Sequence, residues 1–308
     1  MHLRTVFLIG MFITGAFAQP PLVKSIVPLF SETREQYYHP QFSPDDSRLL
    51  LTKSNFQGLF EYHLETGDLK TVTDETGAGY QPAYSVDGQT IYYRTSVMND
   101  RQNYFSLVRY NSATGEKIIV EAGKRDLSPP QNLASGSVVY TTDNEIREIE
   151  IAVRQKKAVC STPYAQIHES KSIRITAGEE AKVIQPKGNR MYLWPSVSPD
   201  SNRLLFTVAG MGTFISDLDG NILVELGQAN VPSWSPDGKW IVFMRDIDDG
   251  HLITASDIYI ANADGSSVMN ITSTPNIIEL YPNWSHEGSK IVCSTDDGAI
   301  YLINLEWK

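Results

Sequence analysis

Two acidic segments near the end of the sequence carry the residues best suited to bind a cation. The first runs from Arg245 to His251, and the second is Asp296-Asp297-Gly298. Together they supply five carboxylates: Asp246, Asp248, Asp249, Asp296 and Asp297. Because Ca²⁺ prefers oxygen ligands, Asp248, Asp249 and Asp296 are candidate ligands for a divalent cation. The same charges would suit a basic peptide or a sugar. The alternative is that these residues cap turns and pair with Arg245.

A second set of residues combines aromatic rings, amides and histidine. Its members stand where short apolar segments begin, and they are Tyr38, His39, Tyr80, Gln81, Tyr192, Trp194 and Tyr281. These residues could line the axial mouth of the fold derived below, where aromatic faces suit stacking against a sugar or a peptide, although core packing is the favoured role for each of them taken singly. With His251 and acidic neighbours, His39 could also contribute to a metal site, but no spacing in the sequence demands one.

Sequence motifs that define common enzymes are absent from the chain. There is no G-x-S-x-G elbow, no glycine-rich phosphate loop, no H-x-x-x-H pair and no C-x-x-C pair. The six histidines are scattered along the sequence rather than clustered. We therefore assign no catalytic residue and expect a binding protein rather than an enzyme.

The elements that must position these residues follow from a repeated phrase of the form Pro-x-aromatic-Ser-Pro-Asp-Gly. Its five clear copies begin at Pro40, Pro82, Pro195, Pro232 and Pro282. Each copy predicts a short inner strand and a tight turn, in which Pro presets φ and Gly takes the left-handed position. An apolar, β-branched strand follows, and a second turn returns the chain. Four antiparallel strands per repeat, arranged radially, make a β-propeller.

The most complete copy, Pro232 to Ile241, resembles the repeat of TolB-like β-propellers, which is also seen in the propeller domains of prolyl-oligopeptidase-type enzymes. The similarity covers nearly all of the chain after residue 18 and corresponds to the propeller of TolB without its N-terminal α/β domain. It implies an all-β, single-domain propeller and, as for TolB, a role in protein assemblies of the cell envelope. It does not imply one activity, because such propellers serve as scaffolds, peptide binders, lyases and substrate gates.

The number of blades is the open question at this stage. A degenerate sixth copy begins at Pro130, and strands are expected over 137–141, 145–153 and 156–161. Three further short strands, over 165–169, 171–176 and 180–185, have no phrase before them and form either a reduced seventh blade or an extra ribbon on the third. We expect six blades, with seven as the alternative. A strand over Leu22 to Phe30 is expected to complete the last blade and close the ring.

The N-terminus predicts export. Arg4 supplies a positive charge, Val6 to Phe17 is apolar, and Ala16-Phe17-Ala18 matches a cleavage site. Residues 1–18 are expected to be a signal peptide and 19–308 the propeller domain, periplasmic or secreted and without membrane insertion after cleavage. Cys160, expected on an outer strand of the third unit, and Cys293 are expected to be buried free thiols.

Composition narrows the choice of partner. The 308 residues include 26 Lys and Arg against 36 Asp and Glu, a net charge of −10 without a basic cluster, so nucleic acid is excluded. Short turns occupy one face, while longer loops, including 96–103, 186–194 and 245–252, occupy the other. We expect a module that binds a protein or peptide at this loop-rich mouth. No cofactor is expected, with Ca²⁺ or another divalent cation as the exception. The alternative is a lyase or hydrolase acting on an oligosaccharide through an axial His/Asp site.

Overall fold

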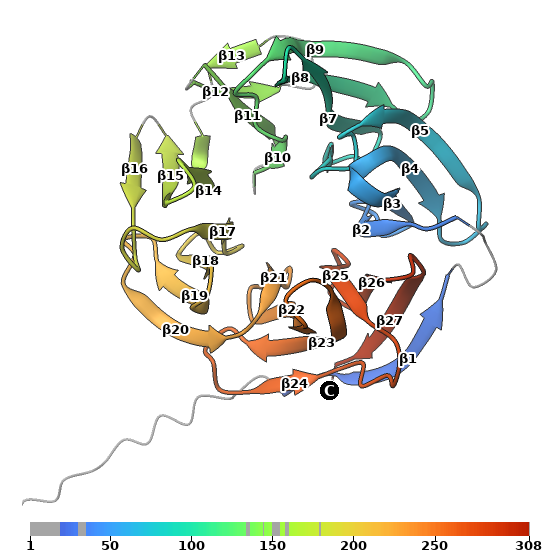
Figure 1. Cartoon of the computed structure of the whole chain (residues 1–308), viewed down its shortest axis with the longest axis vertical. Coiled ribbons are helices and arrows are strands. Elements are labelled where there is room, and N and C mark those ends of the chain that lie inside the picture. Colours follow the sequence, from blue (N-terminus) through green and yellow to red (C-terminus); the bar gives the residue numbers. More distant parts are fainter. Residues whose placement is uncertain are drawn as a thin grey trace, which may run out of the picture.

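Seven β-sheets surround a central axis in the computed structural model of the chain (Figure 1). The structure describes residues 19–29, 35–133, 136–143, 145–149, 155–157, 160–178 and 180–307, with the backbone alone at 155–157 and 160–161. The predicted signal peptide lies outside these residues. No helix in the described part of the chain is long and apolar enough to cross a membrane.

Blades 1 to 3 follow one another along the chain. Blade 1 comprises β2 (Tyr38–Phe42), β3 (Arg48–Thr52), β4 (Gln57–His63) and β5 (Leu69–Thr76), with a short 3-10 helix, η1 (Ser54–Phe56), between β3 and β4. Blade 2 comprises β6 (Ala83–Tyr84), β7 (Thr90–Asn99), β8 (Gln102–Asn111) and β9 (Lys117–Lys124). Blade 3 comprises β10 (Gln131–Asn132), β11 (Val138–Thr142), β12 (Glu145–Ile149) and β13 (Gln155–Lys157).

Blades 4 to 7 complete the ring. Blade 4 comprises β14 (Cys160–His168), β15 (Ser172–Gly178) and β16 (Glu180–Ile184). Blade 5 comprises β17 (Tyr192–Val197), β18 (Arg203–Val208), β19 (Gly212–Asp217) and β20 (Ile222–Gly227). Blade 6 comprises β21 (Asn230–Trp234), β22 (Trp240–Asp248), β23 (Ile253–Asn262) and β24 (Val268–Asn270). Blade 7 comprises β25 (Glu279–Trp284), β26 (Lys290–Thr295), β27 (Ile300–Glu306) and β1 (Leu22–Pro28).

The expectation of six blades is wrong, and the alternative of seven is correct. Blade 4 is the reduced unit, with three strands among the described residues, whereas every other blade has four. Its inner strand β14 begins at Cys160, which pairs with Gly178, so Cys160 belongs to blade 4 and not to an outer strand of the third unit. Of the repeated phrase, blade 4 retains only Pro163. For that reason the sequence pattern did not identify this blade. Cys293 is a fully buried free thiol, as expected, and its burial raises its pKa.

The repeated phrase forms the predicted tight turn at the end of each inner strand. In all five clear copies the serine hydroxyl accepts a hydrogen bond from the N–H five residues ahead, at 2.9–3.0 Å. Glycine has positive φ in three of these turns, and Asp46 and Ser201 take its place in blades 1 and 5. Each turn therefore fixes the point where an inner strand leaves the axis.

Apolar contacts between neighbouring blades hold the ring together. Phe42, Tyr84 and Trp284, the aromatic residues of three copies, are at most 5% exposed and pack against the preceding blade. A polar contact supplements this packing where Arg48 of blade 1 reaches the buried Glu61 at 2.8 Å and donates to the carbonyl of Gly88 in blade 2 at 2.9 Å.

Ring closure follows the predicted scheme. β1 pairs antiparallel with β27, from Leu22 opposite Glu306 to Pro28 opposite Tyr301, so the N-terminal strand is the outermost strand of blade 7 (Figure 1). Between blades 7 and 1, the Asp46 carboxylate accepts hydrogen bonds from the N–H groups of His286 and Glu287 at 2.7 and 2.9 Å. Both the sheet and the seam beside it are therefore closed by direct hydrogen bonds.

Candidate functional site at the propeller axis

A repeated backbone irregularity turns five side chains toward the axis. In blades 1, 2, 5, 6 and 7, the residue just before the proline of the phrase has φ between 49 and 56°, and these residues are His39, Gln81, Trp194, Val231 and Tyr281. Four of these positions coincide with a register shift in the inner strand. Positive φ is unfavourable for residues other than glycine, above all for the β-branched Val231. Such strain tends to persist where it positions a functional side chain.

All five of these residues line one cavity of about 380 Å³ at the loop-rich end of the axis. We call this cavity the mouth. Phe56 and Tyr80 complete its aromatic wall, and Gln41 and Asn283 add carboxamides. The described residues that line the mouth include no Asp, Glu, Lys or Arg. The mouth is therefore an uncharged pocket of rings, prolines and amides.

The rings form one continuous cluster across blades 7, 1 and 2. The centroid of His39 lies 3.8 Å from that of Tyr281 and 4.7 Å from that of Phe56, and Phe56 meets Tyr80 edge-to-face at 5.0 Å. Arg94 supports Tyr80 from behind, with its guanidinium 5.4 Å from the ring centroid. These contacts make the wall rigid before any ligand arrives.

Burial in this cluster controls the charge of His39. It lowers the pKa of His39 to about 4, so the imidazole is neutral at pH 7. Burial also raises the pKa of Tyr281, and the charge of the nearby Asp246 adds to this effect. The mouth therefore offers a neutral imidazole and a neutral phenol to a ligand at physiological pH.

None of the five predicted acidic residues lines the mouth. Asp248 and Asp249 occupy the end of the hairpin made by β22 and β23, where Asp248 accepts from the N–H of Gly250 at 2.8 Å and Asp249 accepts from those of His251 and Leu252 at 2.9 Å. Asp246 accepts from the amide of Asn230 at 2.6 Å. The backbone N–H groups held by Asp249 lower its pKa.

The second acidic segment and Arg245 are engaged in the same local way. Asp297 accepts from the hydroxyl of Thr295 within its own turn, and the backbone carbonyl of Asp296 accepts from Tyr38 at 3.3 Å. Arg245 donates to the carbonyl of Gln228 and lies over the ring of Tyr259, and it forms no ion pair with the acidic residues. In the part of the chain that the structure describes, no three His, Cys, Asp or Glu residues are grouped to hold a metal ion. The turn-capping alternative thus describes Asp248, Asp249 and Asp297, while the pairing with Arg245 is wrong.

Two segments predicted as loops are long hairpins instead. β7 and β8 stay paired up to Asn99 and Gln102, and β22 and β23 up to Asp248 and Ile253. The exposed apolar residues at their ends are Val97, Met98, Ile247 and Leu252, with exposed fractions of 64–72%. Because blades 2 and 6 flank blades 1 and 7, these hairpins lie on either side of the aromatic cluster. His251, at the end of the second hairpin, is exposed and does not line the mouth with His39.

The opposite end of the axis holds a second cavity, of about 460 Å³, which no sequence pattern predicted. It shares Gln41, Gln81 and Pro82 with the mouth. It also includes Ser198 and Pro199, from a tight turn on the short-loop face. Sequence reasoning also missed Val231 and Phe56 in the mouth. A signal for Val231 was present, since it precedes the phrase proline as His39 and Tyr281 do.

Sheet topology and the axial pocket define this protein as a seven-bladed β-propeller with a preformed axial cavity. Among solved structures it is similar to an oligogalacturonate lyase from Vibrio parahaemolyticus, with a TM-score of 0.59 and 12% identity over 92% of this chain and 96% of that chain. It is also similar to an oligogalacturonate lyase in complex with manganese, with a TM-score of 0.57 and 14% identity over 92% and 95% of the two chains.

The propeller of TolB is a further structural relative. TolB from Acinetobacter baumannii matches with a TM-score of 0.50 and 17% identity, over 79% of this chain and 55% of the TolB chain. No model of a known protein family matches the sequence, and no curated protein matches it either. Identities this low show a common fold and no common activity.

Proposed function

We propose that this propeller is a binding module that engages a peptide segment of a protein partner at its mouth. The observation that carries the proposal is the placement of five strained pre-proline residues around one cavity, with the rings of His39 and Tyr281 in direct contact. Large, rigid aromatic residues are the side chains that contribute most at protein interfaces.

The chemistry of the mouth suits an uncharged, extended segment with an apolar or aromatic side chain. A peptide that enters the axis loses hydrogen bonds to water, and it needs both donors and acceptors in return. Gln41 and Gln81 supply both kinds of group from their carboxamides. The apolar ends of the two long hairpins, at Met98 and Leu252, extend the contact surface on either side.

Selection of peptides from a random library against residues 19–308 tests this proposal. Peptides that bind the mouth should lose at least about 10-fold in affinity with Tyr281→Ala, because truncation of a buried aromatic anchor costs roughly 2 kcal/mol. Leu223→Ala is the matched control, since Leu223 is 56% exposed on the outer strand β20 and distant from the axis. Failure to select any peptide, or equal loss with both variants, would refute the proposal.

An oligosaccharide lyase or hydrolase is the second candidate, and it is favoured by the neutral imidazole beside aromatic rings that suit sugar stacking. Two structural relatives are described as oligogalacturonate lyases. Against it, a base with a pKa of about 4 accepts a proton weakly at neutral pH. Incubation with acidic and neutral oligosaccharides, with chelator or with added divalent cations, separates the two proposals. Cleavage that disappears with His39→Gln would favour the enzyme.

We also propose that the protein is exported and acts outside the cytoplasm, on the basis of its N-terminal sequence alone. Expression of the full sequence in a bacterial host, followed by fractionation and mass measurement of the product, tests this. A product that starts at Gln19 in the periplasm or medium is the expected result. A full-length product that stays in the cytoplasm would contradict it.

A further inference from the structure

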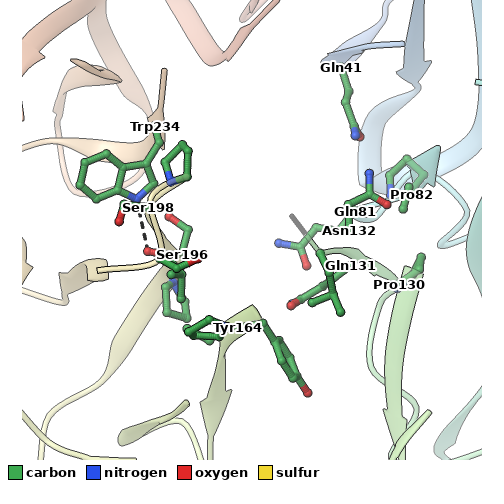
Figure 2. Close-up of a pocket in the computed structure, with 18 residues that line it drawn as sticks. Gln41, Gln81, Pro82, Pro130, Gln131, Asn132, Tyr164, Ser196, Ser198 and Trp234 are labelled. Atoms are coloured by element: carbon green, nitrogen blue, oxygen red, sulfur yellow. Dashed lines mark hydrogen bonds between the residues drawn. The ribbon is translucent and has the colours of Figure 1, made fainter. Parts of the chain in front are cut away.

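The second cavity has two chemically different walls (Figure 2). Blades 1, 2 and 3 contribute the carboxamides of Gln41, Gln81, Gln131 and Asn132. Facing them are the indole of Trp234 and the hydroxyl of Ser196, from blades 6 and 5. The indole is held in place by a hydrogen bond of 3.3 Å from its N–H to the backbone carbonyl of Ser196. An aromatic ring on one side and a row of amides on the other thus enclose the space.

Five polar side chains of this cavity, unlike those of Ser198 and Tyr164, have no hydrogen-bond partner among the described residues. Among the described residues, none of the four carboxamides forms a side-chain hydrogen bond, and the Ser196 hydroxyl oxygen is buried without a partner. Half-buried amides elsewhere behave differently. Asn230, Asn270 and Asn304 donate to Asp246, Asp257 and Ser25, at 2.6, 3.0 and 2.9 Å. Gln81 and Asn132 are exposed and Gln41 and Gln131 are half-buried, so water can reach all four carboxamides, whereas Ser196 Oγ is a buried polar atom of the kind that normally has a partner. A ligand with hydrogen-bonding groups could replace this water and also reach the serine hydroxyl.

The ligand must be uncharged. The described residues that line the cavity include no Lys, Arg, Asp or Glu, so a carboxylate, phosphate or amine would lose water without gaining a counter-charge. It must also offer donors and acceptors close together, because each carboxamide presents an N–H₂ donor beside a C=O acceptor. Vicinal hydroxyls meet this requirement, since every hydroxyl both donates and accepts. The Trp234 indole is 8% exposed and carries the Arg203 guanidinium 4.8 Å from its ring centroid, so it adds only a small apolar contact at the wall of the cavity.

We propose that the second cavity binds a neutral mono- or disaccharide, at a site on the other end of the axis from the peptide site at the mouth, with which it shares Gln41 and Gln81. Its volume of about 460 Å³ lies in the lower half of the range of small-ligand pockets, roughly 300–1,000 Å³, which fits one or two sugar rings. The site opens beside the short tight turns, at the other end of the axis from the aromatic cluster. The proposal predicts discrimination against uronic acids, the class to which galacturonate belongs.

Calorimetric titration with matched sugars tests the proposal. The probes are glucose, galactose, N-acetylglucosamine, maltose, cellobiose and lactose, together with glucuronic and galacturonic acids as the charged twins of glucose and galactose. At least one neutral sugar should bind. The uronic acid that corresponds to that sugar, or to the terminal ring of a disaccharide, should bind at least about 10-fold more weakly. No binding by any neutral probe at millimolar concentration, or equal binding of the charged twin, would overturn the proposal.

Variants locate the site and separate it from the mouth. Gln131→Leu should weaken sugar binding at least about 5-fold, because it removes one donor and one acceptor. Gln131→Glu keeps the size of the side chain but adds a charge, and it should weaken binding as well. Gln102→Ala, at the exposed end of β8, is the control. Tyr281→Ala should leave sugar binding unchanged while it weakens peptide binding at the mouth at least about 10-fold. An unchanged affinity with both Gln131 variants, or a loss with Tyr281→Ala, would overturn the assignment.

Discussion

Replacing Asp46 by alanine should open the seam between blades 7 and 1. The Asp46 side chain is 5% exposed, and its carboxylate accepts from two backbone N–H groups, those of His286 and Glu287. Alanine leaves both donors facing the space that the carboxylate had filled. The same substitution also places a Cβ without a polar side chain at φ 55°, where aspartate and asparagine are better tolerated.

The expected loss can be worked out from these contacts. A hydrogen bond to a charged group contributes about 1.5–3 kcal/mol, and the two donors here are only partly buried, so their loss amounts to roughly 2–4 kcal/mol. The positive φ adds about 1 kcal/mol. Asp46→Asn keeps one acceptor and tolerates the backbone conformation, so it should lose roughly half as much as Asp46→Ala.

Equilibrium unfolding in urea measures these losses, and Ser201→Ala is the matched control. Ser201 stands at the same position of the blade 5 turn with φ 61°, and its side chain makes no hydrogen bond among the described residues. It therefore reports the backbone cost alone, about 1 kcal/mol. Equal destabilisation by Asp46→Ala and Ser201→Ala would refute the closing role of the carboxylate.

Three further predictions concern pH and packing. Burial holds the pKa of His39 at about 4 in the folded protein, against 6.5 in the unfolded chain. As the pH falls the unfolded state therefore binds a proton first, and up to about 3 kcal/mol of stability should be lost between pH 6.5 and 4. Urea unfolding of His39→Gln should lack this loss. Burial raises the pKa of Glu279 from 4.5 to about 7. The contribution of this carboxyl group to stability is therefore complete below pH 4.5 and is lost as the pH rises to 7. Glu279→Gln should be up to about 3 kcal/mol more stable than the wild type at pH 8 and similar to it at pH 4. These two effects oppose each other in the wild type, so a flat pH profile of both variants would contradict them. Gly79→Ala would drive a Cβ into the buried Thr52 side chain and should cost about 1–3 kcal/mol in thermal unfolding. Gly115→Ala has open space around it and should cost only about 1 kcal/mol, because of its φ of +75°. Equal losses would show that steric overlap at Gly79 is not the cause.

Sequence alone predicted the elements that have a local cause. The tight turns, the inner strands that end in them and the closing strand all follow from residue types with strong backbone preferences, such as Pro236 and Gly238. Blade 4 escaped because its inner strand keeps only Pro163, and neither a Ser-Pro-Asp turn nor an aromatic phrase residue accompanies it. Where local signals were missing, strand pairing set the structure, and pairing depends on partners distant in sequence.

The candidate site, like the fold, was predicted in part. His39, Tyr80, Gln81, Trp194 and Tyr281 were placed at the axial mouth because they enter inner strands, and the structure brings these five together. The positive φ values of His39, Gln81, Trp194 and Tyr281 could not be foreseen, since a residue before proline normally favours extended backbone. The acidic residues were predicted as a site from their charge, but Asp248, Asp249 and Asp297 cap their own turns and Asp246 accepts from Asn230. Their distance from the mouth depends on hairpin lengths that no local pattern encodes.

Pairing of β1 with β27 has a consequence for the order of assembly. Leu22 of β1 pairs with Glu306 of β27, so blade 7 cannot be completed until β27 has been synthesised. Blades 1 to 6 each consist of consecutive strands and can form as the chain lengthens, whereas this one contact spans nearly the full sequence. Until β1 docks on it, β27 presents an unpaired edge that another chain could join. Pairing of β1 thus covers the edge of β27 and protects the finished ring from association with a second, incomplete copy.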